Sequence, residues 1–225
     1  MCDSYKPVSK YYDTISSIYS LGQIPKCRNA FIREILEAPK GRNPTRLEVC
    51  FAGAGHAVEA ISLAEEGALV TVVDTSASML EVFQRKLSHG SDDTKARVKI
   101  IHGDIRNVSN RYDWVVANFF LNVFPESEMV KMVDTLLEKC RSHGSLVVGD
   151  FYYNTEGNGF KRTLQKMNWA LALSVFRILV KNANHPIYDY REYLSKRGWN
   201  SDEVKQFGLL GVSFYQSEKF TKIMA

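Results

Sequence analysis

The stretch that decides the fold is Phe51-Ala52-Gly53-Ala54-Gly55-His56-Ala57, a turn of small residues between an apolar run and a helical pattern. Small residues at such a turn let the backbone approach a ligand closely. A helix that begins here presents unpaired N–H groups and the positive end of its dipole at the same place. The turn therefore predicts a ligand site between the first strand and the first helix of an α/β core.

Apolar and β-branched runs alternate with helical patterns on both sides of this turn, which is typical of a parallel sheet with crossover helices. The expected strands are Arg46 to Ala52, Ala68 to Thr75, Val98 to Ile105, Tyr112 to Val123 and Ser145 to Tyr153. The expected helices are His56 to Glu66, Ser76 to Leu87 and Glu126 to Arg141, ended at or near the glycines Gly67, Gly90 and Gly144.

Two segments extend this core, and we expect one domain with four parts. Residues 1–44 carry two short helical patterns and form an N-terminal helical cap, and residues 45–153 form the cofactor-binding core. Residues 154–199 exceed the length of a crossover helix, so they predict a helical lid insertion built on Phe160 to Val180. Residues 200–225 form a terminal strand pair, near Glu203 to Phe207 and Val212 to Thr221.

The composition is that of an ordinary globular protein of 225 residues, with 45% hydrophobic and 24% charged residues. No apolar run reaches the roughly 20 residues of a membrane span, and no secretory signal opens the chain, so we expect a cytoplasmic protein. The four cysteines are scattered, which argues against a metal site or a disulfide framework. The net charge of +4 is dispersed, so nucleic acid is not the favoured partner.

The second expected strand ends in Asp74, where a carboxylate can accept both hydroxyl hydrogens of a ribose. A dinucleotide site requires Gly-x-Gly-x-x-Gly, and Val58 stands at the third glycine. With Asp74 as the reference, the turn is instead Gly53-x-Gly55-x-Ala57. In this form the sequence resembles class I S-adenosylmethionine-dependent methyltransferases over at least residues 46–153.

Further stretches match that family in order. They are Ser76-Ala77-Ser78-Met79-Leu80 after Asp74, His102-Gly103-Asp104-Ile105 at the end of the third strand, and the fourth strand from Tyr112 to Phe119. The run from Tyr12 to Gly22 is similar to the entry helix of quinone-type C-methyltransferases. The resemblance implies a Rossmann-like, mostly parallel seven-stranded sheet with helices on both faces.

The resemblance also implies the cofactor, S-adenosylmethionine, and the residues that bind it. Asp74 would hold the ribose, Asp104 the adenine, and Tyr19 the methionine end. The full predicted set is Tyr19, Phe51, Gly53, Gly55, Asp74, Thr75, Met79, Asp104, Ile105 and Asn118. Neither a metal nor a nicotinamide is needed.

The sequence departs from the family pattern at three positions. Phe51 stands where the family carries an acid that binds the ammonium group, and Glu48 lies three positions too early. Ala57 replaces the third glycine. Ser20 stands where the quinone enzymes usually carry Asp, so the substrate assignment does not rest on that subgroup.

Several residues have a structural interpretation beside the functional one. Asp104 would also serve as a turn former or helix cap, and His56, at a helix start, is expected to be exposed. His185, Tyr188 and Asp189 are the candidates for a catalytic base, although Asp189 would also cap a helix from Tyr188 to Lys196.

The sequence therefore predicts methyl transfer to a small organic acceptor, with an apolar or aromatic one suited to Phe119 and Phe120. The apolar stripes of residues 160–180 suit a lid over a lipophilic acceptor, and they leave peripheral membrane contact open. The alternatives are an NAD-linked oxidoreductase and a non-catalytic module that binds a cofactor or a partner.

Overall fold

The structure is a computed structural model that describes residues 3, 5–38, 47–153, 158–180 and 187–223, with the backbone alone for residues 175–180. Its centre is a seven-stranded sheet in the order β3-β2-β1-β4-β5-β7-β6. The strands are β1 (Glu48–Ala52), β2 (Leu69–Asp74), β3 (Val98–His102), β4 (Tyr112–Asn118), β5 (Cys140–Phe151), β6 (Trp199–Leu209) and β7 (Val212–Lys222). The first five pair in parallel, and β7 runs antiparallel to both neighbours. The predicted fold class is confirmed.

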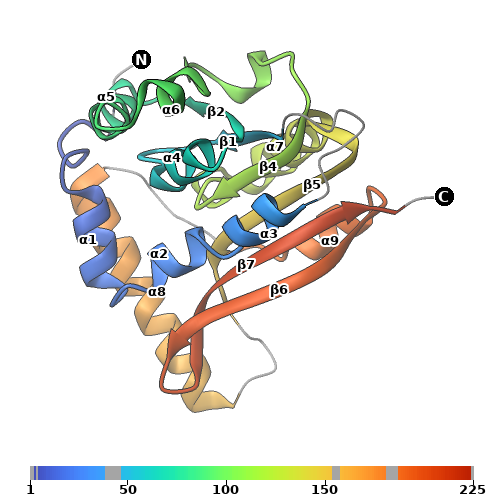
Figure 1. Ribbon diagram of the computed structural model, residues 1–225. Coiled ribbons are helices and arrows are strands. Elements are labelled where there is room, and N and C mark those ends of the chain that lie inside the picture. The colour runs from blue at the N-terminus through green and yellow to red at the C-terminus, as the bar shows by residue number, and fades with distance from the viewer. Residues whose placement is uncertain (1–2, 4, 39–46, 154–157, 181–186, 224–225) are drawn as a thin grey trace.

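Helices cover both faces of the sheet (Figure 1). One face packs against α3 (Ile32–Glu37), α4 (Val58–Glu65) and α5 (Ala77–Leu87). The other packs against α7 (Glu126–Lys139) and α9 (Tyr190–Ser195). The remaining helices are α1 (Tyr12–Tyr19), α2 (Gln23–Arg28), α6 (Asp92–Ala96), α8 (Gly159–Val180) and the 3₁₀ turns η1 (Ile105–Asn107) and η2 (Leu121–Val123).

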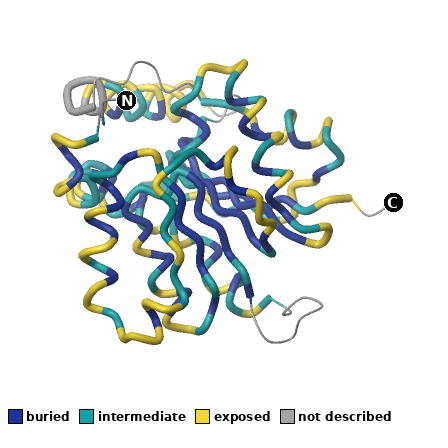
Figure 2. Tube along the Cα trace, turned by 90° about the horizontal axis from the view of Figure 1, so that it is seen from above, coloured by how far each residue is buried: buried dark blue, intermediate teal, exposed yellow. Residues whose placement is uncertain are grey.

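The alternation of side chains along β1 divides the core in two. Cys50 and Ala52 face the cluster under α7, whereas Val49 and Phe51 face the cluster under α3, α4 and α5. Figure 2 shows the result from above, with buried strands in the middle and the exposed surfaces of helices around them. Parallel strands buried on both faces explain the nearly continuous apolar runs of the sequence.

Three predicted boundaries are wrong for local reasons. The fourth strand ends at Asn118 and not at Val123, because Phe119 has a positive φ of 53° and η2 follows it. The third strand ends at His102, since Ile105 opens η1. Gly144 does not cap α7: it lies inside β5, which begins at Cys140.

The N-terminal segment and α8 pack together beside the sheet (Figure 1). The N-terminal segment contains three short helices instead of the two expected, and residues 39–44, at the end of the predicted cap, lie outside the described residues. α8 is joined to α1 by the Tyr19 hydroxyl, which donates to the carbonyl of Asn168 at 3.0 Å. Gln165 Nε2 joins α8 to β7 by donating to the Ser213 carbonyl at 2.7 Å.

Within the described residues, no helix is long and apolar enough to cross a membrane. This includes α8, whose 22 residues carry charged side chains among the apolar ones. The prediction that residues 160–180 form one helix is confirmed.

Candidate functional site

A cavity of about 400 Å³ opens at the carboxyl ends of β1, β2 and β4, next to the small-residue turn. This is where open α/β sheets bind ligands. Its volume lies in the range of small-molecule sites. Nine of the ten predicted cofactor residues line it, namely Phe51, Gly53, Gly55, Asp74, Thr75, Met79, Asp104, Ile105 and Asn118.

The turn after β1 takes a conformation that favours glycine. Gly53, Gly55 and Ala57 have φ values of 59°, 55° and 36°. A side chain at Gly53 is excluded, because its Cβ would lie 1.9 Å from Phe120 Cδ2. A Cβ at Gly55 would only reach Met79 Cε at 3.6 Å, so the space above this backbone belongs to the cavity.

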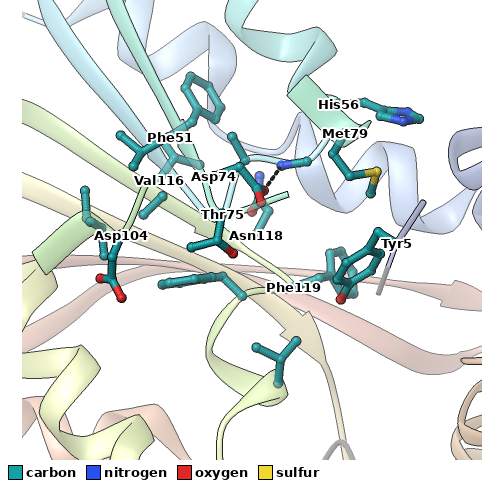
Figure 3. Close-up of a pocket in the computed structure, with 18 of the residues that line it drawn as sticks. Tyr5, Phe51, His56, Asp74, Thr75, Met79, Asp104, Val116, Asn118 and Phe119 are labelled. Atoms are coloured by element: carbon teal, nitrogen blue, oxygen red, sulfur yellow. Dashed lines mark hydrogen bonds between the residues drawn. The ribbon is translucent and has the colours of Figure 1, made fainter. Parts of the chain in front are cut away.

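Asp74 connects the turn to the end of β2 (Figure 3). Its Oδ2 accepts from the Gly55 N–H at 2.6 Å, and its Oδ1 accepts from the Ser76 N–H at 2.8 Å. Burial raises the pKa of Asp74 and outweighs these two hydrogen bonds, and the charge of Asp3 adds to the rise. A carboxylate has about four acceptor positions, so this side chain can still accept from ligand hydroxyls.

Asp104 caps a helix, as its structural interpretation predicted, and it also lines the cavity, as the prediction of adenine binding requires. Its carboxylate caps η1 by accepting from the Arg106 N–H at 2.9 Å, and the Arg106 guanidinium binds both of its oxygens. The hydrogen bonds from Arg106 lower the pKa of Asp104. The side chain is therefore an ionised, fixed acceptor at the rim.

The departure from the family at position 51 has no local compensation from Glu48. The Phe51 ring packs in the cluster beneath α4 and is 3% exposed. Glu48 begins β1 and pairs with Arg141 at 2.8 Å, at the opposite edge of the sheet from the cavity. An acid for a ligand's ammonium group has to come from another element.

Such a group lies on the cavity wall in the Arg28 cluster, which we define as Asp13, Arg28, His56, Glu59 and Lys86. Arg28 binds Glu59 through Nε at 2.7 Å and through Nη2 at 2.9 Å, and it binds Asp13 through Nη1 at 3.0 Å. Asp13 Oδ2 also lies 2.8 Å from His56 Nδ1 and 2.5 Å from Lys86 Nζ.

Arg28, His56 and Glu59 line the cavity, and their side chains are largely buried. Asp13 and Lys86 lie farther out and are partly exposed. Burial opposes ionisation of Asp13, but the hydrogen bond with His56 and the charge of Arg28 hold its pKa below the ordinary value. The expectation that His56 is exposed is wrong: it is 2% exposed, because α1 covers it. No motif in the sequence pointed to Arg28, and Asp13 lies in the predicted entry helix, where no role was predicted for it.

The tenth predicted residue, Tyr19, does not line the cavity. Its ring packs beside Phe151 and Tyr215, and its hydroxyl is used by Asn168. The aromatic residues that the N-terminal segment supplies to the cavity are instead Tyr5 and Tyr12. Tyr5 lies on the turn before α1, and Tyr12 is the first residue of α1. The N-terminal end of α1 therefore faces the cavity, and not the C-terminal end that carries Tyr19.

Two of the three candidate bases, Tyr188 and Asp189, lie away from the cavity lining. Asp189 is exposed and caps α9 by accepting from the Arg191 N–H at 3.1 Å. The prediction that it caps this helix is confirmed. Tyr188 donates to the carbonyl of Phe124 at 2.9 Å and so supports the cavity wall from behind. His185 lies outside the described residues.

Aromatic side chains form the wall of the cavity nearest to β4 and β5. Phe119, Phe120 and Phe124 line it, and Phe119 packs edge to face on Phe151 at 5.7 Å between ring centroids. A smaller compartment continues from it and adds Asn122 and Phe151. No described residue of α8 lines either space, and Trp169 packs in the cluster with Tyr215. The lid remains a prediction.

A family model and a curated relative match part of this chain. Residues 49–144 match a family model described as "Methyltransferase domain". A demethylmenaquinone methyltransferase of Clavibacter sepedonicus is 29% identical over 150 residues, which is 65% of this chain. The alignment spans only 56% of the length of that relative.

Solved structures share the fold over nearly the whole chain. Magnesium protoporphyrin IX methyltransferase from Synechocystis PCC 6803, with bound S-adenosylhomocysteine, has a TM-score of 0.67 and 20% identity, over 98% of this chain and 97% of its own. A Burkholderia thailandensis 1,6-didemethyltoxoflavin-N1-methyltransferase has a TM-score of 0.59 and 15% identity, over 100% and 92%.

Proposed function

We propose that this chain is a class I methyltransferase that transfers a methyl group from S-adenosylmethionine to a small organic acceptor. The observation that carries this function is the position of Asp74, whose carboxylate faces the glycine turn within one cavity. The resemblance predicted from the sequence is confirmed by the family model and by the shared fold. The matches described above are methyltransferases and give no support to an NAD-linked oxidoreductase.

The residues of the cavity fit this cofactor in three places. Asp74 has acceptor positions left for the ribose hydroxyls, and the positive φ of Gly55 leaves its backbone open to a ligand. α4 begins directly after this turn, so the positive end of its dipole lies near the same space. The adenine would lie against the adjoining lining residues Thr75, Met79, Asp104 and Ile105. Asn118 also lines the cavity.

We place the methionine end of the cofactor at the Arg28 cluster. The Arg28 guanidinium has five N–H groups, and the bonds to Glu59 and Asp13 use three of them. The others suit a carboxylate, while Glu59, 4% exposed on the cavity wall, supplies the negative charge that Phe51 lacks. This arrangement replaces the acid that is missing from β1.

The cofactor supplies an activated methyl group, so the protein's task is alignment and exclusion of water. The aromatic wall of Phe119, Phe120 and Phe124 would hold a flat apolar or aromatic acceptor against the cavity. Asn122 lines the smaller compartment together with Tyr5 and Tyr12, and it would orient an acceptor's hydroxyl or amine. We assign no general base. The free, buried thiols of Cys27, Cys50 and Cys140 agree with a cytoplasmic location.

The function is tested first by thermal shift of the full chain. A ligand that binds only the folded state raises the melting temperature by an amount set by the logarithm of its concentration relative to its dissociation constant. S-adenosylhomocysteine at 100 times its dissociation constant stabilises by about 2.7 kcal/mol. We expect this shift, and no shift with NAD at the same concentration. The reverse pattern would exclude the methyltransferase, and no shift with either ligand would favour a non-catalytic module.

The methionine-end assignment is tested by a second prediction. Arg28→Gln should weaken binding of S-adenosylhomocysteine at least about tenfold, because a charged hydrogen bond to the carboxylate is lost. Binding of adenosine, which has no methionine end, should not change. Calorimetry with both ligands separates the loss of a local contact from general damage, since a misfolded cavity would lose both.

A further inference from the structure

Exposed apolar side chains gather on one part of the surface, the packed pair of α1 and α8. Among the described residues, large apolar side chains are most exposed at nine positions, and six of these lie on or next to the two helices. They are Tyr11, Ile18, Leu21, Phe160, Met167 and Leu171, with exposed fractions of 55% to 72%. We call this set the α1/α8 surface.

The part of this surface on α8 is a continuous stripe. Phe160, Met167 and Leu171 are separated by seven and four positions, which places them on one side of a helix of 3.6 residues per turn. Gln165 and Ala172, on another side, are 4% and 1% exposed and pack inward. The side chains of this stripe therefore do not belong to the folded core. Their exposure to water is unfavourable unless another surface covers them.

From residue 157 to residue 188, the charged residues of the sequence have one sign. Residues 157–188 contain no Asp or Glu and carry the cations Lys161, Arg162, Lys166, Arg177 and Lys181. Lys161 and Lys166 are exposed, and Lys166 Nζ lies 5.9 Å from the Tyr153 ring centroid. Residues 14–33, which include the exposed Ile18 and Leu21, also contain no acidic residue. Among the described residues, the α1/α8 surface thus joins exposed apolar side chains to the exposed lysines Lys161 and Lys166.

We propose that the α1/α8 surface binds an anionic lipid bilayer, with the apolar stripe of α8 in the interface and the lysines at the headgroups. Apolar side chains on one side of a helix and cations beside them are what an interfacial helix requires. Lysines next to a membrane surface are attracted by anionic lipids. A second copy of the chain would present the same cations to this surface, and like charges oppose that pairing. The inference does not rest on the proposed enzymatic activity.

The experiment is co-sedimentation of the full chain with vesicles. We expect binding to vesicles of phosphatidylcholine and phosphatidylglycerol at 3:1, and weak binding to pure phosphatidylcholine. The triple variant Phe160→Ser/Met167→Ser/Leu171→Ser should bind the anionic vesicles at least about tenfold more weakly, because it loses apolar area from the interface. Lys161→Gln/Lys166→Gln should bind more weakly and lose part of the salt dependence.

The control is Ile223→Ser, which removes an apolar side chain that is 50% exposed at the other end of the chain. It should bind as the unmodified chain does. Melting temperature, measured for every variant, shows whether each one is folded. The proposal is overturned if the unmodified chain does not bind anionic vesicles, if the triple variant binds them equally well, or if the chain is a dimer that the triple variant dissociates.

Discussion

Asp74→Ala is expected to weaken binding of S-adenosylhomocysteine by about 10- to 150-fold, because the ribose hydroxyls lose a charged acceptor worth about 1.5–3 kcal/mol. The loss should be as large for adenosine, since the ribose is common to both ligands. This distinguishes Asp74 from Arg28, whose variant should affect the methionine end alone. Calorimetry with the two ligands is the measurement.

The side chain also holds the turn, so the fold of the variant needs its own readout. Removing the carboxylate leaves the N–H groups of Gly55 and Ser76 without their acceptor. Asp74→Asn keeps one acceptor oxygen, and it should fall between the alanine variant and the unmodified chain. Asp92→Ala, at a fully exposed carboxylate on α6, is the matched control and should bind normally. An unchanged dissociation constant in Asp74→Ala would show that the ribose site lies elsewhere.

Affinity should also depend on pH through this residue. The pKa of Asp74 is raised in the free protein, mainly by burial. A ribose hydroxyl donates best to the ionised carboxylate, so the affinity should fall as the pH is lowered through that raised pKa. Asp74→Asn, which does not titrate, should lose this dependence and serves as its control.

Much of the sheet could be predicted because its signals are local. Strands β1 and β2 are apolar runs that end in a glycine turn and in Asp74, and the sequence spacing alone places both at one edge of a parallel sheet. Nine of the predicted cofactor residues follow from those two strands and the next two. The end of β4 was missed because the apolar run continues to Val123, while the backbone turns at Phe119. A pattern of apolar residues does not show where the backbone leaves the extended conformation.

The Arg28 cluster could not be predicted because its members come from four separate helices. Asp13 lies on α1, Arg28 on α2, Glu59 on α4 and Lys86 on α5, and each would be an ordinary surface residue of its own helix. Only the packing of the N-terminal helices over the turn brings them together. The same packing buries His56, whose position at a helix start predicted exposure.

Stability should fall as the pH rises from about 5 to 8, because of a buried carboxyl group at the end of β5. Asp150 is 5% exposed, and burial raises its pKa from 3.8 to about 7, although three hydrogen bonds favour the ion. The donors are Tyr190 Oη, the Phe151 N–H at 2.7 Å and Asn122 Nδ2 at 2.6 Å. All three donors are neutral.

The sign of the effect follows from where the proton is released. The unfolded chain loses the Asp150 proton near pH 3.8, whereas the folded protein keeps it up to about pH 7. Between these two pH values the folded state binds more protons than the unfolded chain. The free energy of unfolding therefore decreases as the pH rises from about 3.8 to about 7, and Asp150 adds no further change above that range. At 1.36 kcal/mol per pH unit, the loss between pH 5 and 7 is on the order of 2–3 kcal/mol.

Asp150→Asn isolates this contribution. An amide has the same shape, its oxygen accepts from Asn122 and from the Phe151 N–H, and its NH₂ group can donate to Tyr190. Urea unfolding of both proteins at pH 5 and pH 8 should show a loss of stability in the unmodified chain that is absent, or much smaller, in the variant. Every other titrating group is common to both, so equal pH dependences would mean that Asp150 is ionised throughout this range. Asn122 lines the smaller compartment and donates to Asp150, so that result would also place a buried negative charge directly behind this compartment.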